Sequence, residues 1–164
     1  MNYKKNVAIM TTGYKNSALN LAINAARKHG ATHFMSIDND MVFPPDGINR
    51  LLEQDKEIIG ATYNERRFPL RSTVKMADES GQLYSGDISQ YTETFPVYSL
   101  GLGFVLMKMS VFDKVNKPWF NSPLEENDNF STEDFYFFDK CQKVGIEIFC
   151  DPRITVKHKG TYLY

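Results

Sequence analysis

The chain has 164 residues, enough for one domain with a substantial core. Its formal net charge is −1, so no global basic field favours bulk nucleic-acid binding. It has neither a long apolar segment nor a signal peptide, which favours a soluble cytoplasmic protein with no transmembrane segment. Cys141 and Cys150 have neither metal-binding nor redox spacing and are expected to be core thiols in a reducing compartment.

The first part of the chain alternates segments typical of strands and of helices. The expected elements are a strand over 7–10, a helix from Asn16 or Ser17 to Lys28-His29-Gly30, a strand over 32–37, a short helix capped by Asp46, and a strand over 57–63. This order is typical of a parallel sheet with helices on both faces.

The second part mixes hairpin and helix patterns. The expected elements are a hairpin of 71–76 and 82–84, strands over 94–98 and 103–109, a short helix from Ser110 to Val115, a polar acidic loop over 121–129, a helix from Ser131 or Thr132 to about Val144, and strands over 146–150 and 154–156. No repeat or domain boundary is visible, so residues 1–164 are expected to form one α/β domain. Its central sheet should be mixed, mainly parallel and flanked by helices.

The segment Phe34-Met35-Ser36-Ile37-Asp38-Asn39-Asp40 carries two aspartates to the end of an expected buried strand. In an extended chain Asp38 and Asp40 point to the same side, at the edge where open α/β sheets build ligand sites. Adjacent carboxylates repel each other unless a cation is near, and oxygen ligands suit Mg²⁺ or Mn²⁺. The motif therefore predicts a metal site for a phosphate-bearing ligand, and the alternative is that the aspartates only cap a turn.

A second acidic pair, Glu133 and Asp134, follows Ser131-Thr132. This pattern resembles a capping box, and acidic side chains in the first turn suit the helix dipole. One of the two carboxylates could also face a cleft as a general base, and the two interpretations are compatible.

Four further positions have both a structural and a functional interpretation. His158 follows an apolar run and is either a surface residue or a third metal ligand beside Asp40. Gly101-Leu102-Gly103 allows close approach of a ligand to the backbone. Trp119 is either a core residue or a platform for a sugar ring. Arg66-Arg67 is either solvated surface or a phosphate contact.

Four segments, in this order, resemble the GT-A class of nucleotide-sugar-dependent glycosyltransferases, most of all small bacterial and phage-type members of family 2. The segments are "FMSIDNDMVFPPDGINRLL", "EIIGATYNERR", "GLGFVLMKMSVF" with "KPWF", and "STEDFYFFDKCQKVG" with "ITVKHKG". The resemblance implies a GT-A-like fold and a hexosyltransferase-type enzyme. It also implies transfer, with inversion, from a nucleotide-diphosphate sugar, first of all a UDP-sugar, to an acceptor hydroxyl.

The resemblance also implies roles for individual residues. Asp40 would bind Mn²⁺ or Mg²⁺, Asp38 would contact the ribose or the metal shell, and His158 would complete the metal site. Asp134 would be the general base, with Glu133 as the alternative. The remaining implied donor contacts are Gly101, Leu102, Gly103, Trp119, Arg66 and Arg67.

The chain departs from this family pattern at its start, where only six residues precede the first expected strand. Either residues 7–12 replace the usual base-binding unit or that unit is missing. A second hypothesis is therefore a non-catalytic carbohydrate- or nucleotide-binding module on the same scaffold. A third, nucleotidyl transfer, has poor support, because Thr11-Thr12-Gly13-Tyr14-Lys15 is a weak phosphate loop.

Overall fold

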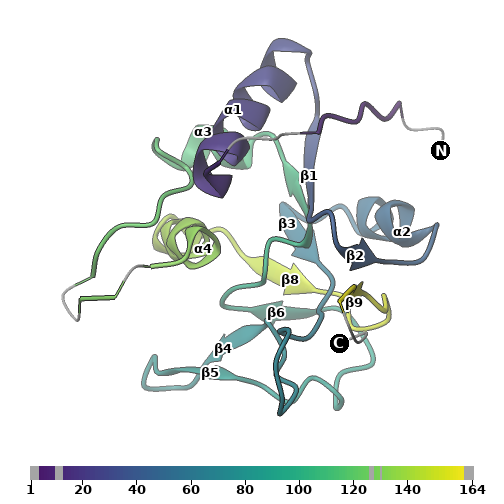
Figure 1. Cartoon of the computed structure of the whole chain (residues 1–164), viewed down its shortest axis with the longest axis vertical. Helices are drawn as coiled ribbons and strands as arrows, with labels where there is room; N and C mark the ends of the chain where they lie inside the picture. Colours follow the sequence, from purple (N-terminus) through teal and green to yellow (C-terminus); the bar gives the residue numbers. More distant parts are fainter. Residues whose placement is uncertain (1–3, 10–12, 126–127, 130, 161–164) are drawn as a thin grey trace.

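Five strands form the central sheet of the computed structural model, which describes residues 4–9, 13–125, 128–129 and 131–160 (Figure 1). In sheet order they are β1 (His33–Ile37), β7 (Phe104–Lys108), β3 (Ile58–Gly60), β8 (Ile148–Cys150) and β6 (Phe95–Val97). Strand β7 runs antiparallel to both β1 and β3, β3 and β8 are parallel, and β6 is antiparallel to β8.

The expected mixed sheet is confirmed, but the expectation that it is mainly parallel is wrong. Strands β1, β3 and β8 do run in one direction. Strand β7 separates β1 from β3, so only one of the four pairings is parallel. The apolar pattern of a segment predicts a buried strand, but it does not specify which neighbour that strand pairs with.

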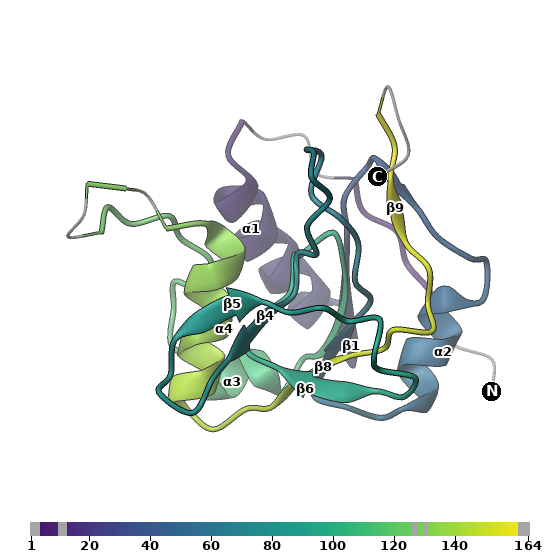
Figure 2. The same cartoon turned by 90° about the horizontal axis from the view of Figure 1, so that it is seen from below.

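Helices cover both faces of this sheet, as expected (Figure 2). The helices are α1 (Lys15–Lys28), α2 (Gly47–Glu53), α3 (Val111–Lys114) and α4 (Glu133–Lys143). Helices α1, α3 and α4 pack on one face and α2 on the other. In the part of the chain that the structure describes, no helix is long and apolar enough to cross a bilayer.

Alternation along the strands divides the core into two layers. Ile58 and Met107 belong to the layer under α1, α3 and α4, while their neighbours Ile59 and Leu106 belong to the layer under α2. Successive side chains of a strand point to opposite faces, so each inner strand needs apolar residues at consecutive positions. This explains the continuous apolar runs in the sequence. The two cysteines are buried free thiols in the first layer, as expected.

The strand expected at the start of the chain is absent over residues 7–9, and Met10 lies outside the described residues. Val7 and Ile9 are 89% and 86% exposed. Strand β1 is the last strand of the sheet on this side, and residues 7–9 do not add a strand to its outer edge. Lys5 instead donates a hydrogen bond to Asn49 of α2, at 2.9 Å.

Two small ladders complete the fold. The expected hairpin is confirmed as β4 (Lys75–Ala77) paired with β5 (Leu83–Ser85). β2 (Met41–Val42) pairs antiparallel with β9 (Lys157–His158). The strand expected over 154–156 is wrong: Ile154 and Val156 are buried under α2, but regular pairing begins only at residue 157.

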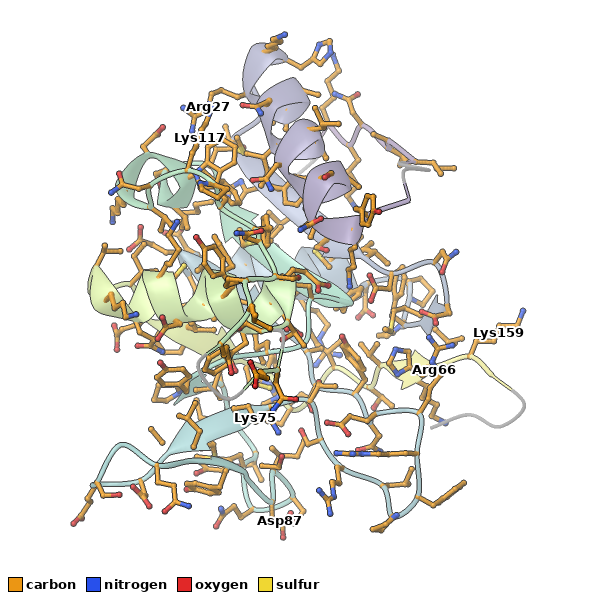
Figure 3. All side chains as sticks on the ribbon, turned by 60° about the vertical axis from the view of Figure 1, so that its left-hand side comes forward. Arg27, Arg66, Lys75, Asp87, Lys117 and Lys159 are labelled. Carbon is orange, nitrogen blue, oxygen red and sulfur yellow. The ribbon has the colours of Figure 1, made fainter. Side chains whose placement is uncertain are left out.

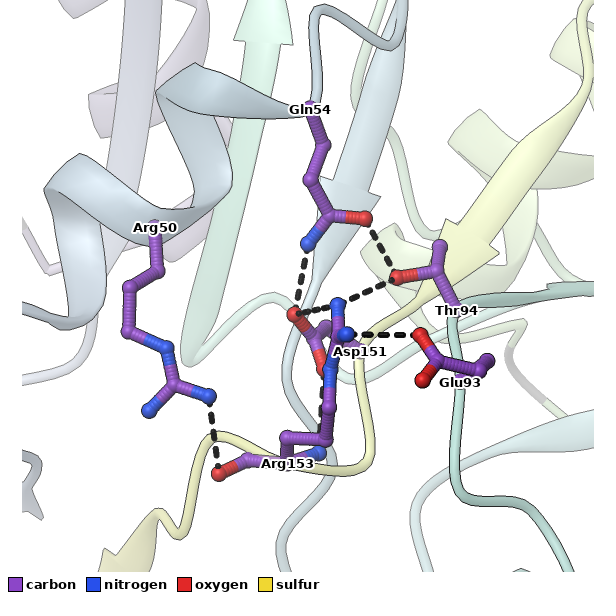
Figure 4. Close-up of polar contacts among 6 residues, drawn as sticks. All are labelled: Arg50, Gln54, Glu93, Thr94, Asp151 and Arg153. Carbon is purple, nitrogen blue, oxygen red and sulfur yellow. Dashed lines mark hydrogen bonds and ion pairs between the residues drawn. The ribbon is translucent and has the colours of Figure 1, made fainter.

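A buried carboxylate, Asp151, ties three segments together outside the candidate site (Figure 4). Its oxygens accept hydrogen bonds from Gln54 at 2.5 Å and from the Arg153 guanidinium at 2.9 Å, and Arg153 also pairs with Glu93 at 2.6 Å. Burial alone would raise the pKa of Asp151, but the hydrogen bonds and charge of Arg153 outweigh it and hold this pKa below its usual range.

Candidate functional site

Asp38 and Asp40 stand where the sequence places them, at the carboxyl end of β1. The Asp38 backbone N–H donates to the carbonyl of Gly103 at 3.1 Å, and the N–H of Met41 donates back to the carbonyl of Asp38 at 3.2 Å. The carbonyl of Asp40 accepts from the N–H of Lys159 at 2.6 Å. These bonds hold the aspartate turn against both β7 and β9, so tertiary contacts fix the backbone conformation of the turn.

Tyr63, which the sequence analysis did not single out, lies at the centre of this edge. Its buried hydroxyl accepts a hydrogen bond from the Gly103 N–H at 2.8 Å. Burial raises the pKa of Tyr63, the Gly103 hydrogen bond opposes this, and the negative charges of Asp38, Asp134 and Asp40 raise it further. The fold thus brings these three carboxylates within electrostatic reach of one phenol, although Asp134 lies far along the chain from the other two.

His158 lies against the same phenol. The two rings meet edge to face, with centroids 4.7 Å apart. The Nδ1 atom of His158 lies 2.8 Å from the carbonyl oxygen of Asn64, so Nδ1 carries the proton and donates it there. This arrangement leaves Nε2 as the basic nitrogen, and histidine ligands of metals are commonly oriented in this way.

Helix α4 begins with the second acidic pair. The Thr132 hydroxyl caps the helix by accepting from the Phe135 N–H at 3.4 Å, so Thr132 rather than Ser131 is the cap. Asp134 accepts from the same N–H at 2.7 Å and from the Thr132 hydroxyl. Burial raises the pKa of Asp134, while the hydrogen bonds from Thr132 and Phe135 oppose the increase. A cap is present, but the expected capping box of Ser131 and Asp134 is not formed, because the Ser131 N–H donates to the carbonyl of Pro123 at 2.9 Å. Asp134 remains a candidate base.

Lys15, at the start of α1, connects the two acidic pairs. Its ammonium lies 3.1 Å from Asp38 and 3.2 Å from Glu133. Burial alone would lower the pKa of Lys15, but the two carboxylates outweigh it and raise this pKa. One feature of the sequence could have indicated this role of Lys15. A lysine in the first turn of a helix is unfavourable beside the positive end of the helix dipole, and an acidic partner offsets this.

Of the two adjacent arginines, only Arg66 enters the site, with Nη2 2.7 Å from the Asp40 carboxylate. Arg67 pairs instead with Glu65. Arg66 and Lys159 lie near each other at the right of Figure 3, away from Asp87 at the bottom.

The glycine segment shapes the site indirectly. A Cβ at Gly101 or Gly103 would collide with the hydroxyl end of the Tyr63 side chain, so both glycines let that end approach the backbone closely. Leu102 is buried in the core layer of α1, α3 and α4. Leu102 therefore packs in the core and does not line a sugar pocket, contrary to what the resemblance had implied.

Trp119 is a core residue, which decides between its two interpretations. It is 1% exposed, and its indole N–H donates to the carbonyls of Phe112 at 3.0 Å and Val115 at 3.1 Å. A ring this deeply buried offers no face for a sugar to stack on. The sequence could not separate the alternatives, because burial depends on the packing of α1 and α3 around it.

The donor groups of Asp38, Asp40 and His158 are chemically suited to Mn²⁺ or Mg²⁺: two carboxylates and an imidazole with a defined basic nitrogen. As the side chains stand, no three His, Cys, Asp or Glu residues in the described ranges are close enough to hold a metal. Arg66 and Lys15 occupy the carboxylates instead. The three residues therefore have donor atoms of a suitable kind, but the described side chains are not gathered into a metal site, and the two carboxylates are paired with Arg66 and Lys15.

The fold and site define a small α/β protein with a mixed sheet and an acidic cluster at one sheet edge. No protein-family model matches the sequence, and no curated protein matches it. Among solved structures, one described as "Crystal Structure of A197 from STIV" is similar, with a TM-score of 0.60 over 90% of this chain and 68% of that chain. The two sequences are 16% identical, so this likeness concerns the fold alone.

Proposed function

We propose that this chain is a metal-dependent, GT-A-like glycosyltransferase that moves a sugar from a nucleotide-diphosphate donor to an acceptor hydroxyl. The observation that carries the proposal is the ion pairing of Lys15 with both Asp38 and Glu133, which brings the first turn of α4, with Asp134, to the aspartate turn after β1. A general base and a cation-binding pair on one sheet edge are the groups this displacement requires.

The topology supports the same class. Strands β1, β3 and β8 run in one direction, and the aspartate pair follows β1 directly. Ligand sites of open α/β sheets lie outside the carboxyl ends of such strands. The antiparallel β7 brings Gly103 to this same end, where its N–H supports Tyr63.

We assign the donor diphosphate to the side of the site that holds Asp38, Asp40 and His158. A divalent cation bound there would neutralise negative charge on the departing nucleotide. Arg66 and Lys15 are the chain's own cations at this position. On donor binding they would exchange their carboxylate partners for phosphate oxygens, which form charge-assisted hydrogen bonds with such groups.

We assign the acceptor to the side of the site that holds α4. Asp134 would remove the proton from the attacking hydroxyl, and its raised pKa brings it nearer to the value of an efficient base at neutral pH. Glu133 would instead hold Lys15 in place, at 3.2 Å. We place the reaction in the cytoplasm, in keeping with the two free, buried thiols.

A thermal-shift measurement with UDP and Mn²⁺ tests the binding half of this proposal. Both ligands together should raise the melting temperature, because they bind the folded state. Asp40→Asn should abolish the increase, whereas Asp87→Asn, a distant exposed aspartate, should preserve it. No shift with any nucleoside diphosphate and metal would refute the proposal.

A second candidate function is a non-catalytic carbohydrate- or nucleotide-binding module. Residues 7–9 are exposed and add no strand beside β1. They therefore do not form the base-binding unit expected at that position, which favours a binding module over an enzyme. Radiolabelled donor with a range of acceptors distinguishes the two functions. A ligand-induced shift with neither sugar transfer nor donor hydrolysis would select the module.

A further inference from the structure

The loop that joins β3 to β4 has a hydrogen-bonded base and a solvent-exposed tip. At its base, the hydroxyls of Thr62 and Ser72 lie 2.8 Å apart, and the N–H of Thr73 donates to the carbonyl of Tyr63 at 3.0 Å. Nearer the tip, the N–H of Glu65 donates to the carbonyl of Arg71 at 2.9 Å. The two arms are therefore paired, and the tip is presented in a defined position.

All six residues of this tip, 66–71, are exposed. Phe68 and Leu70 are 69% and 49% exposed, although large apolar side chains are normally buried. Pro69 lies between them, so the tip carries three consecutive apolar residues. We call residues 66–71 the arginine-apolar tip.

The charge of the tip is positive. Residues 64–71 contain Arg66, Arg67 and Arg71 against the single acid Glu65, which gives a local net charge of +2 on a chain whose total is −1. Lys159 lies on the same rim, next to Arg66 (Figure 3). The positive charge is thus concentrated around the exposed apolar residues.

The tip also stands at the mouth of the candidate site. Arg66 lies 2.7 Å from the Asp40 carboxylate, and the backbone carbonyl of Asp40 accepts a hydrogen bond from the N–H of Lys159 at 2.6 Å. In Figure 2 the loop projects in the same direction as the β9 end of the chain. Any surface that contacts the tip therefore lies beside the acidic cluster.

We infer that the arginine-apolar tip docks the protein onto an anionic lipid surface. Exposed aromatic and aliphatic side chains enter the interfacial region of a bilayer, and neighbouring arginines bind anionic headgroups. A single strand of nucleic acid would also attract the arginines, but it is recognised by stacked aromatic side chains. Phe68 is the one aromatic residue of the tip, and Leu70 and Pro69 provide no such stacking. The pairing of aliphatic bulk with positive charge favours lipid.

Co-sedimentation with vesicles tests the inference on the full chain, and it needs no sugar transfer, so its outcome is independent of the proposed function. The protein should bind phosphatidylcholine vesicles containing about 30% phosphatidylglycerol, bind pure phosphatidylcholine far more weakly, and lose affinity as salt increases. Arg67→Gln with Arg71→Gln should weaken binding about 25-fold, at about fivefold for each arginine. Phe68→Ser with Leu70→Ser should weaken it about tenfold or more.

Matched variants on the helices serve as controls. Lys114→Gln with Lys143→Gln removes two exposed cations, and Val144→Ser removes an exposed apolar side chain, and neither should change vesicle binding. Because the tip residues are exposed, their variants should melt at the wild-type temperature. In a Phe68→Trp variant, emission should shift to the blue on anionic vesicles, since the native Trp119 is already buried.

Three results would overturn the inference. The first is equal binding of the wild type to neutral and anionic vesicles. The second is that both tip double variants bind anionic vesicles as well as the wild type does. The third is that the protein binds a single-stranded oligonucleotide through the tip and does not bind vesicles.

Discussion

The rings of Tyr63 and His158 meet edge to face, with centroids 4.7 Å apart. This contact joins the exit of β3 to β9, and each partner has a second anchor in a backbone group. The Tyr63 hydroxyl accepts from Gly103, and His158 donates to the carbonyl of Asn64. The buried phenol of Tyr63 therefore links β9 to the glycine segment, and Asp38, Asp40 and Asp134 lie within electrostatic range of it.

Tyr63→Phe should destabilise the fold by about 1–3 kcal/mol, because the buried N–H of Gly103 would lose its acceptor. Tyr84→Phe, on the half-exposed side of β5, is the matched control and should change stability by less than about 0.5 kcal/mol. Urea unfolding of both variants measures the difference. Equal stabilities would mean that the Tyr63 hydroxyl contributes nothing to the fold.

Asp134→Asn should change the pH dependence of stability in a defined direction. Burial raises the folded-state pKa of Asp134 above that of the unfolded chain, so the folded protein holds this proton to higher pH. The resulting stabilisation is full below the unfolded-state pKa and is lost as pH rises through the folded-state pKa. The melting temperature of the variant minus that of wild type should therefore increase over this range.

Asp87→Asn is the control of opposite sign for this experiment. Hydrogen bonds from Ser89 lower the pKa of Asp87, so this carboxylate contributes stability above the unfolded-state pKa and loses it as pH falls. Thermal melts from about pH 3 to pH 8 cover both titrations. A difference for Asp134→Asn that is constant with pH would show that the pKa is not raised.

Arg66→Gln should increase the affinity for Mn²⁺, measured by calorimetry without nucleotide. Arg66 pairs with Asp40 at 2.7 Å and competes with a metal for that carboxylate. Half-exposed ion pairs contribute little, so the gain should be about two- to fivefold. Arg67→Gln, whose partner is Glu65, should leave Mn²⁺ binding unchanged. Equal affinity in wild type and both variants would exclude Asp40 as the ligand with which Arg66 competes.

Trp119→Phe should lower stability without affecting ligand binding. The variant leaves the carbonyls of Phe112 and Val115 without their indole donor and opens a gap in the core, at a cost of about 1–3 kcal/mol. The increase in melting temperature given by UDP and Mn²⁺ should equal that of wild type. If Trp119→Phe lost this increase in melting temperature, Trp119 would have to contribute to ligand binding.

Much of the local structure could be predicted from the sequence. The apolar spacing of α1, the aspartate turn after β1 and the cap of α4 all depend on residues a few positions apart, and all three are present. The strand expected over 7–10 is absent over its described residues 7–9, because a strand exists only where a neighbour completes its hydrogen bonds. The same reason accounts for the direction of the sheet, which β7 decides by pairing with both β1 and β3.

The site divides in the same way. The sequence by itself determined that Asp38 and Asp40 follow a strand and that Asp134 lies in the first turn of a helix, because these are consequences of short-range periodicity and capping. It also predicted that this strand is buried, which is wrong: β1 lies at the edge of the sheet, and Ile37 is 39% exposed. Only the tertiary structure decided that Tyr63 lies among the three carboxylates, that Lys15 joins Asp38 to Glu133, and that Trp119 is in the core. Such contacts join residues far apart in the chain, and their energies depend on burial and on the direction of each side chain. Both are set by packing and by strand order.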